Sequence, residues 1–267
     1  MSLIERPSPN FDARTRKVDL VVLHYTGMQD AETALARLTD PSPKAGRYPG
    51  PWAPADLPAD ADLGRVSAHY VVAEDGRVFR LVDETNRAWH AGVAAWDGES
   101  DVNARSIGIE IVNGGHDFGL PPYTEPQLAA LEDLLVDILA RHALGPHRVV
   151  GHSDVAPARK LDPGEHFPWA RLAARGLSLW PLKPTAPDGP LAAGPEDVIA
   201  TQEALAAFGY GLQATGEVDE ATEAVVCAFQ RRFRTRRIDG RIDSETAAIL
   251  ADVGDQAARL KIARLRS

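Results

Sequence analysis

Short apolar runs recur along the first two thirds of the chain and predict β-strands. Residues 18–23, Val-Asp-Leu-Val-Val-Leu, are nearly all apolar, which suits a central strand covered on both faces. Two more β-rich runs, 67–72 and 77–82, flank Glu74-Asp75-Gly76, and an Asp-Gly step between such runs is typical of a hairpin. The chain therefore opens with several strands.

Polar and apolar residues alternate in the next predicted strand, 106–112. Successive side chains of a strand point to opposite faces. We expect one face to carry Ile107, Ile109 and Ile111 and the other face to carry Gly108, Glu110 and Val112. A further short strand is predicted at 148–150.

Helical periodicity separates these strands. Residues 30–38 predict a short helix with Asp30 as its cap. The longest helix should begin at Thr124, because Thr124 and Gln127 match a capping box and an apolar stripe of leucine and isoleucine follows. Alternating strands and helices predict an α/β fold for residues 1–180.

Proline and glycine punctuate residues 181–194, which predicts a linker and a domain boundary. Beyond it, residues 195–267 predict a small all-α domain with helices at 195–208, 219–233 and 243–251. The sequence Gly-Glu-Val-Asp-Glu-Ala-Thr at 216–222 resembles Gly-Arg-Ile-Asp-Ser-Glu-Thr at 240–246. Each copy reads as a glycine turn, an apolar anchor, an aspartate cap and a helix start.

Composition excludes several classes of protein. A net charge of −9 argues against a nucleic-acid partner, because phosphate neutralisation needs a basic face. Cys227 is the single cysteine, so no disulfide forms within the chain. No stretch is apolar enough to span a membrane, and the N-terminus lacks the apolar run of a signal peptide. We expect a cytoplasmic protein as the chain reads, or one of the periplasm or cell envelope if a leader has been removed.

The segment 149–163 carries the strongest chemical signal. A short apolar strand leads into a loop with His152, Lys160 and Asp162. Catalytic zinc takes three protein ligands and keeps one position for water. His24, which follows the strand 18–23, is the third candidate ligand, because ligands gather at the carboxyl ends of strands in open α/β sheets. With eight histidines in the chain, spacing alone leaves a metal site and a set of structural histidines equally open.

Glu110 and Lys160 are the candidate catalytic groups. Glu110 is the acid within the strand 106–112 and could act as a general base on a metal-bound water. Lys160 could share a face with Asp162 and stabilise an oxyanion. The alternatives are a solvent-facing strand residue and an exposed lysine. His69 and His90 could line the cleft or serve the structure, and the long loop 40–64 could form one wall of that cleft.

Five motifs in order resemble the type 2 zinc N-acetylmuramoyl-L-alanine amidases, a superfamily that includes peptidoglycan-recognition proteins and amidase-type phage lysozymes. They are Val-Val-Leu-His-Tyr-Thr (21–26), Ser-Ala-His-Tyr-Val-Val (67–72), Trp-His-Ala-Gly (89–92), Ser-Ile-Gly-Ile-Glu (106–110) and Gly-His-Ser-Asp-Val-Ala-Pro-Ala-Arg-Lys-Leu-Asp-Pro-Gly (151–164). The resemblance covers roughly residues 20–175. Residues 195–251 resemble a three-helix peptidoglycan-binding domain.

The resemblance implies a mixed central β-sheet flanked by helices, followed by the three-helix domain. It also implies Zn2+ on His24, His152 and Asp162, with Glu110 as base and Lys160 polarising the carbonyl of the bond between N-acetylmuramic acid and L-alanine. Residues expected to contact substrate are Tyr25, His69, His90, Arg105 and Asn113. Peptidoglycan or muropeptides are the expected partners, and we expect a monomer.

Two alternatives to this enzyme remain. One is a peptidoglycan receptor without activity on the same fold, against which the complete set of ligands, base and lysine argues. The other is a metallo-hydrolase of a different amide, against which the C-terminal domain argues. Anhydro-muropeptides and intact cell wall are both open as substrates.

Overall fold

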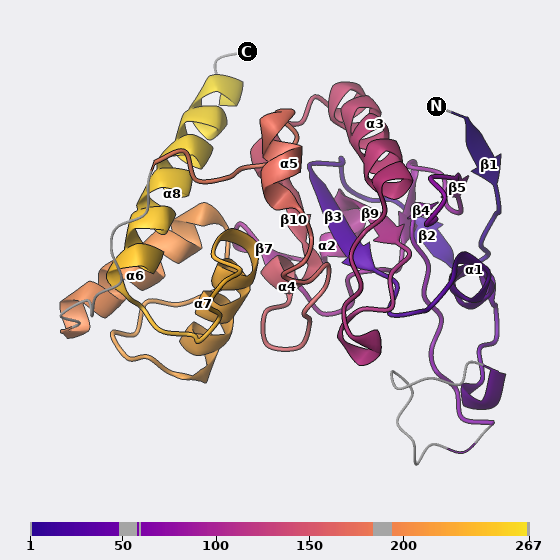
Figure 1. Cartoon of the computed structure of the whole chain (residues 1–267), viewed down its shortest axis with the longest axis horizontal. Coiled ribbons are helices and arrows are strands. Elements are labelled where there is room, and N and C mark those ends of the chain that lie inside the picture. The colour runs from indigo at the N-terminus through magenta and orange to yellow at the C-terminus, as the bar shows by residue number, and fades with distance from the viewer. Residues whose placement is uncertain (1, 48–57, 59, 184–193, 266–267) are drawn as a thin grey trace. The chain divides into compact units, whose positions relative to one another are not determined.

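The structure is a computed structural model, and it describes residues 2–47, 58, 60–183 and 194–265 (Figure 1). The predicted loop 40–64 lies partly outside these residues. Its described part holds a 3-10 turn, η1 (Ala45–Arg47), and a bridge between Lys44 and Asp62. The predicted linker 181–194 lies mostly outside them as well, so the domain boundary stays a prediction.

Six strands form one mixed sheet in the order β1-β5-β4-β9-β3-β10. Their bounds are β1 Leu3–Glu5, β3 Leu20–Tyr25, β4 Tyr70–Val72, β5 Val78–Arg80, β9 Ser106–Ile111 and β10 Val149–Gly151. β9 pairs in parallel with both β3 and β4, whereas β4 and β5 pair antiparallel. The predicted mixed sheet and the predicted hairpin around Gly76 are confirmed.

Two short antiparallel pairs accompany the main sheet: β2 (Phe11–Ala13) with β6 (Asn86–Ala88), and β7 (Ala95–Trp96) with β8 (Glu99–Ser100). The helices before residue 180 are α1 (Ala31–Thr39), α2 (Val102–Arg105), α3 (Glu125–His142), α4 (His152–Val155) and α5 (Trp169–Ala174), with 3-10 turns η2 (His116–Phe118) and η3 (Pro146–Arg148). No helix of the described chain is both long and apolar enough to cross a membrane.

The first-turn signals predicted for α1 and α3 are present. The Asp30 carboxylate accepts a hydrogen bond from the backbone N–H of Thr33, and the Thr124 hydroxyl accepts one from that of Gln127. Such caps satisfy backbone donors that the first turn leaves without a helical partner. The buried side chain of Gln127 also donates to the carbonyls of Val72 and Val112, which ties α3 to the sheet.

The two faces of β9 differ as the alternation predicts. Ile107, Ile109 and Ile111 are fully buried. Tyr70 is the register partner of Ile109 and donates to Glu84, which also pairs with the end of α3. The isoleucines therefore point towards the α3 side of the sheet, and Glu110 points to the opposite side.

The described chain divides into two compact units, one of residues 1–92, 103–144 and 162–167 and one of residues 93–102, 145–161 and 168–267. The second unit contains the three C-terminal helices, α6 (Pro195–Phe208), α7 (Glu220–Phe233) and α8 (Ser244–Leu265). The predicted end of the last helix at 251 is wrong. The helix continues through Gly254 because Val253 and Ala257 are buried, and one interior glycine costs only about 1 kcal/mol.

The internal repeat proves to be a repeated structural unit. Gly216 and Gly240 both have positive φ, which favours glycine. In the first copy the fully buried Gln202 accepts from the backbone N–H of Gly216 and donates to Thr222. In the second copy the equally buried Gln230 contacts Gly240 and Thr246 in the same way. Each glutamine fixes one turn, and the turn starts the next helix.

Candidate metal centre

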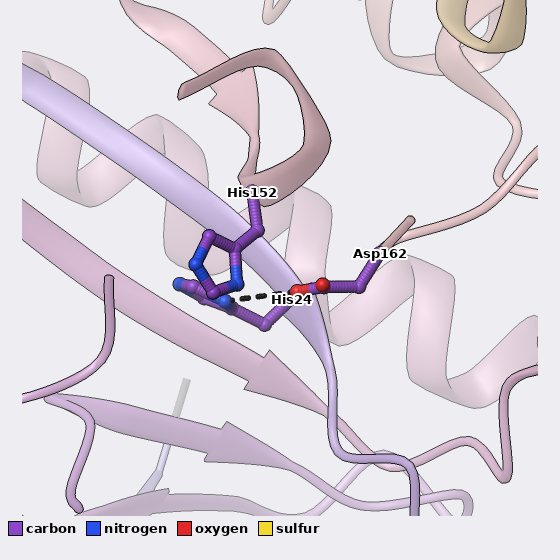
Figure 2. A group of neighbouring side chains, drawn as sticks. All are labelled: His24, His152 and Asp162. Carbon is purple, nitrogen blue, oxygen red and sulfur yellow. Dashed lines mark hydrogen bonds and ion pairs between the residues drawn. The ribbon is translucent and has the colours of Figure 1, made fainter. Parts of the chain in front are cut away.

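His24, His152 and Asp162 meet in one buried cluster (Figure 2). His24 lies near the end of β3, His152 is the first residue of α4, and Asp162 lies in the loop that follows. One ligand atom from each lies within 4.8 Å of the others, and His24 Nδ1 is 3.0 Å from Asp162 Oδ2. These are the three residues predicted as metal ligands.

This donor set fits a divalent metal. Two imidazole nitrogens and one carboxylate oxygen are ligands that zinc accepts in catalytic sites. The three residues are 1%, 4% and 5% exposed, so their polar atoms are gathered in the interior rather than spread over a solvated surface. A cation bound there would compensate the buried carboxylate charge.

Glu110 lies next to the cluster on the neighbouring strand. β3 and β9 run parallel with His24 and Glu110 as register partners, so both side chains point to the same face. Tyr123 lies in the same neighbourhood: burial raises its pKa well above the usual value, and nearby Asp162, Tyr25 and Glu110 raise it further. Its hydroxyl donates to the carbonyl of Pro163, which anchors the loop just after Asp162.

A histidine pair orients His24. His24 Nε2 is 3.0 Å from His90 Nδ1, and His90 Nε2 is 3.1 Å from the Ser106 hydroxyl. If His24 Nδ1 faces a metal, its Nε2–H donates to His90, whose own Nε2–H donates to Ser106. Metal-binding histidines generally use their second nitrogen in this way. Gly108 makes room for the pair, because a Cβ at that position would lie 2.4 Å from His90 Cγ.

Tyr25, adjacent to His24, belongs to a second hydrogen-bonded chain. Its hydroxyl is 3.0 Å from His116 Nδ1, and His116 Nε2 is 3.0 Å from a Glu165 carboxylate oxygen. His116 and Glu165 are 29% and 28% exposed at their side chains, so this chain reaches solvent. His116 and Glu165 are not among the candidate site residues of the sequence, and their pairing joins positions 49 residues apart.

Two of the five predicted substrate contacts are therefore beside the cluster, Tyr25 and His90. The other three make hydrogen bonds within the protein, and their contacts with substrate stay predictions. His69 is fully buried, where its Nδ1 accepts the backbone N–H of Gly108 and its Nε2 faces the carbonyl of Asn86. Burial, with the nearby charge of Arg14, lowers the pKa of His69 to about 3, so the ring is neutral and serves the structure.

Arg105 and Asn113 also have structural partners. Arg105 lies just before β9 and donates two hydrogen bonds to the Asp19 carboxylate. The start of β9 is about 13 Å along the strand from Glu110. Asn113 donates to the carbonyl of Pro121 and accepts from the backbone N–H of Gly115, which closes the loop after β9.

Lys160 is half-buried in the loop between His152 and Asp162, and its backbone N–H donates to the carbonyl of Ala156. This bond holds the loop as a compact turn. The role predicted for its ammonium group stays a prediction.

A family model described as N-acetylmuramoyl-L-alanine amidase matches residues 14–165, which include the whole cluster. The chain belongs to the N-acetylmuramoyl-L-alanine amidase family. A second model, described as a putative peptidoglycan binding domain, matches residues 194–250, which hold α6, α7 and the start of α8.

Relatives of this amidase match over most of its length. It is 33% identical to the N-acetylmuramoyl-L-alanine amidase AmiD of Escherichia coli over 273 residues, which cover 92% of this chain and 88% of AmiD. It is 33% identical to the 1,6-anhydro-N-acetylmuramyl-L-alanine amidase AmpD of Haemophilus influenzae over 169 residues, which cover 61% of this chain and 86% of AmpD.

Solved structures agree with the sequence matches. AmiD of Escherichia coli in complex with anhydro-N-acetylmuramic acid-L-Ala-D-gamma-Glu-L-Lys has a TM-score of 0.73 at 32% identity and covers 92% of each chain. AmpDh3 of Pseudomonas aeruginosa has a TM-score of 0.69 at 33% identity, over 90% of this chain and 92% of its own. The predicted family, fold class and enzyme class are confirmed.

Proposed function

We propose that this amidase hydrolyses the amide bond between N-acetylmuramic acid and L-alanine, with zinc held by His24, His152 and Asp162. The observation that carries the proposal is the buried cluster of these three residues, with Glu110 as the register partner of His24 on the adjacent strand. When bound, zinc supplies Lewis-acid polarisation of the scissile carbonyl and of the attacking water.

Glu110 is proposed as the general base. A half-buried carboxylate on the cluster face can accept a proton from the attacking water and return it to the departing L-alanine nitrogen. Lys160 is proposed to donate a hydrogen bond from Nζ to the carbonyl oxygen as negative charge develops there. Oriented donors of this kind contribute about 3 kcal/mol each to transition-state stabilisation.

Muropeptides that carry anhydro-N-acetylmuramic acid are the proposed substrates. The support is the named substrate of the AmiD complex, together with the name of AmpD as a 1,6-anhydro amidase. The match of residues 194–250 to a peptidoglycan-binding model supports intact peptidoglycan as a second substrate. Measuring the hydrolysis rates of both substrates with the same enzyme preparation shows which one the enzyme prefers.

The cellular compartment of the protein stays a prediction. Fractionation of cells that express the natural gene tests it.

Replacing the base separates catalysis from metal binding. In Glu110→Gln the side chain keeps its size but no longer accepts a proton, so we expect muropeptide cleavage to fall by at least about 100-fold. Zinc content, measured by atomic absorption, should remain at the wild-type value because the three ligands are unchanged. A Glu110→Gln protein that cleaves at the wild-type rate would refute the proposed base.

A further inference from the structure

The turn that presents His152 is held by one buried carboxylate. Asp154 is 1% exposed, and its Oδ2 accepts the backbone N–H of Gly151 at 2.8 Å. That bond fixes the backbone immediately before His152, at the junction of β10 and α4. Because His152 is the first residue of α4, the orientation of its side chain follows from the geometry of this turn.

Two side chains from the C-terminal helical region hold Asp154 in place. The Tyr210 hydroxyl donates to Asp154 Oδ1 at 2.6 Å, and Arg232 Nη1 donates to Oδ2 at 2.8 Å. Arg232 Nη2 also donates to the carbonyl of Val149, which lies two residues before Gly151 on β10. These residues all belong to the same compact unit, so the turn and the helices that hold it form one body.

Both donors are enclosed and well oriented. Arg232 is 2% exposed, and its guanidinium lies over the Trp169 ring at 4.3 Å from the centroid. Burial raises the pKa of Tyr210 well above its usual value, and the charge of Asp154 raises it further, so the hydroxyl stays protonated and donates. A buried carboxylate that loses such partners keeps its desolvation cost, and the turn must then rearrange.

We propose that Arg232 and Tyr210 are positioning residues for the metal ligand His152 and that they act through Asp154. The helical region that matches a peptidoglycan-binding model would then have a second task, to set the geometry of the metal centre. This inference rests on the proposed function in one respect, that His152 binds zinc.

The test compares full-length variants at a temperature where circular dichroism shows each to be folded. Arg232→Met removes the charged donor, and Tyr210→Phe removes one hydroxyl while it keeps the ring. Arg234→Met is the matched control. Arg234 is 3% exposed, and its guanidinium donates to groups of Arg237, Asp239, Asp243 and Glu245 rather than to the His152 turn.

Zinc affinity is measured by competition with a chelator, and the cobalt-substituted proteins give visible absorption spectra that report ligand geometry. We expect affinity to fall about tenfold in Arg232→Met and several-fold in Tyr210→Phe, with altered cobalt spectra. Arg234→Met should keep the affinity within twofold and the spectrum unchanged.

Wild-type affinity and spectra in both Arg232→Met and Tyr210→Phe would overturn the inference, and so would equal losses in Arg234→Met. If Arg232→Met fails to fold, Tyr210→Phe decides. Failure of the proposed function gives a different result, since the wild-type protein itself would then bind no zinc or cleave no muropeptide.

Discussion

At the level of single residues, the site is built from pairs of residues that lie far apart in the sequence. His24 and Asp162 are 138 residues apart and meet at 3.0 Å. Their types and their positions after strands could be predicted from the sequence, because polar residues at the carboxyl ends of apolar strands gather at one edge of a sheet. The contact between His24 and His90 could not, because it depends on the register of β3 against β9 and on the space left by Gly108.

His90 should therefore contribute to metal binding, by orienting His24, rather than to substrate binding. His90→Phe keeps a ring beside Gly108 but removes both the hydrogen bond to His24 and the one to Ser106. We expect zinc affinity to fall by about 10- to 100-fold, as for other residues that orient a metal-bound histidine. The measurement is a chelator competition, with His142→Phe as the control because His142, the last residue of α3, pairs with Glu84. Unchanged affinity in His90→Phe would contradict the orienting role.

At the scale of elements, the caps, the hairpin and the alternation of β9 follow from local sequence and were predicted. The end of α8 was not, because burial of Val253 and Ala257 overrides the glycine at 254. The role of Glu84 was not foreseen either. It follows β5 in the chain and joins Tyr70 of β4 to Arg141 and His142 of α3, which are far apart in the sequence.

Glu84 should make stability depend on pH. Burial opposes its ionisation, but hydrogen bonds from Arg141, Tyr70 and His142 outweigh burial and lower its pKa to about 2. The folded state therefore holds this proton less tightly than the unfolded state, whose carboxyl has its ordinary pKa of 4.5. The stability that Glu84 contributes is fully present above about pH 5 and is lost as pH falls towards 2.

Urea denaturation of the wild type and of Glu84→Gln tests the direction of this pH dependence. At pH 7 the substitution should lower the free energy of unfolding by about 2 kcal/mol. The difference between the two proteins should shrink as the pH falls below 4.5. Titrating groups that do not interact with Glu84 are common to both proteins and cancel in the comparison. A difference that stays constant or grows on acidification would show that ionised Glu84 does not stabilise the fold.

The buried glutamines of the helical repeat allow a second test, of whether they stabilise the turns that they contact. Gln230→Ala leaves the backbone N–H groups of Asp239 and Gly240 without their side-chain acceptor. We expect a loss of about 3 kcal/mol in the free energy of unfolding, because buried donors are costly to leave unpaired. Gln213→Ala, at an exposed position, is the control and should change stability by less than about 0.5 kcal/mol. Equal losses of stability in Gln230→Ala and Gln213→Ala would contradict the role of Gln230 in fixing the turn.

At the scale of the whole molecule, two family models lie in series on one chain, an amidase model over 14–165 and a peptidoglycan-binding model over 194–250. The order of the motifs along the sequence predicted both regions. The compact units could not be predicted from sequence order, because residues 93–102 and 145–161 pack with the C-terminal helices. Buried pairs such as Asp154 with Arg232 bring about that grouping, and they join residues 78 positions apart.

The C-terminal region should give the protein affinity for polymeric cell wall. Full-length Glu110→Gln, chosen so that the wall is not digested, should sediment with purified sacculi. Soluble peptidoglycan fragments added in excess should return it to the supernatant. A protein that stays in the supernatant without competitor would argue against wall binding, and an unrelated protein of similar charge controls for nonspecific sedimentation.

The central claim is that this chain breaks one defined bond. Mass spectrometry of an anhydro-muropeptide digested in water enriched with oxygen-18 tests it most directly. We expect two products, a peptide with a free L-alanine amine and a muramic acid whose lactyl carboxylate carries one heavy oxygen. We also expect that a zinc chelator stops the reaction and that added zinc restores it. An intact muropeptide, or cleavage at any other bond, would contradict the account.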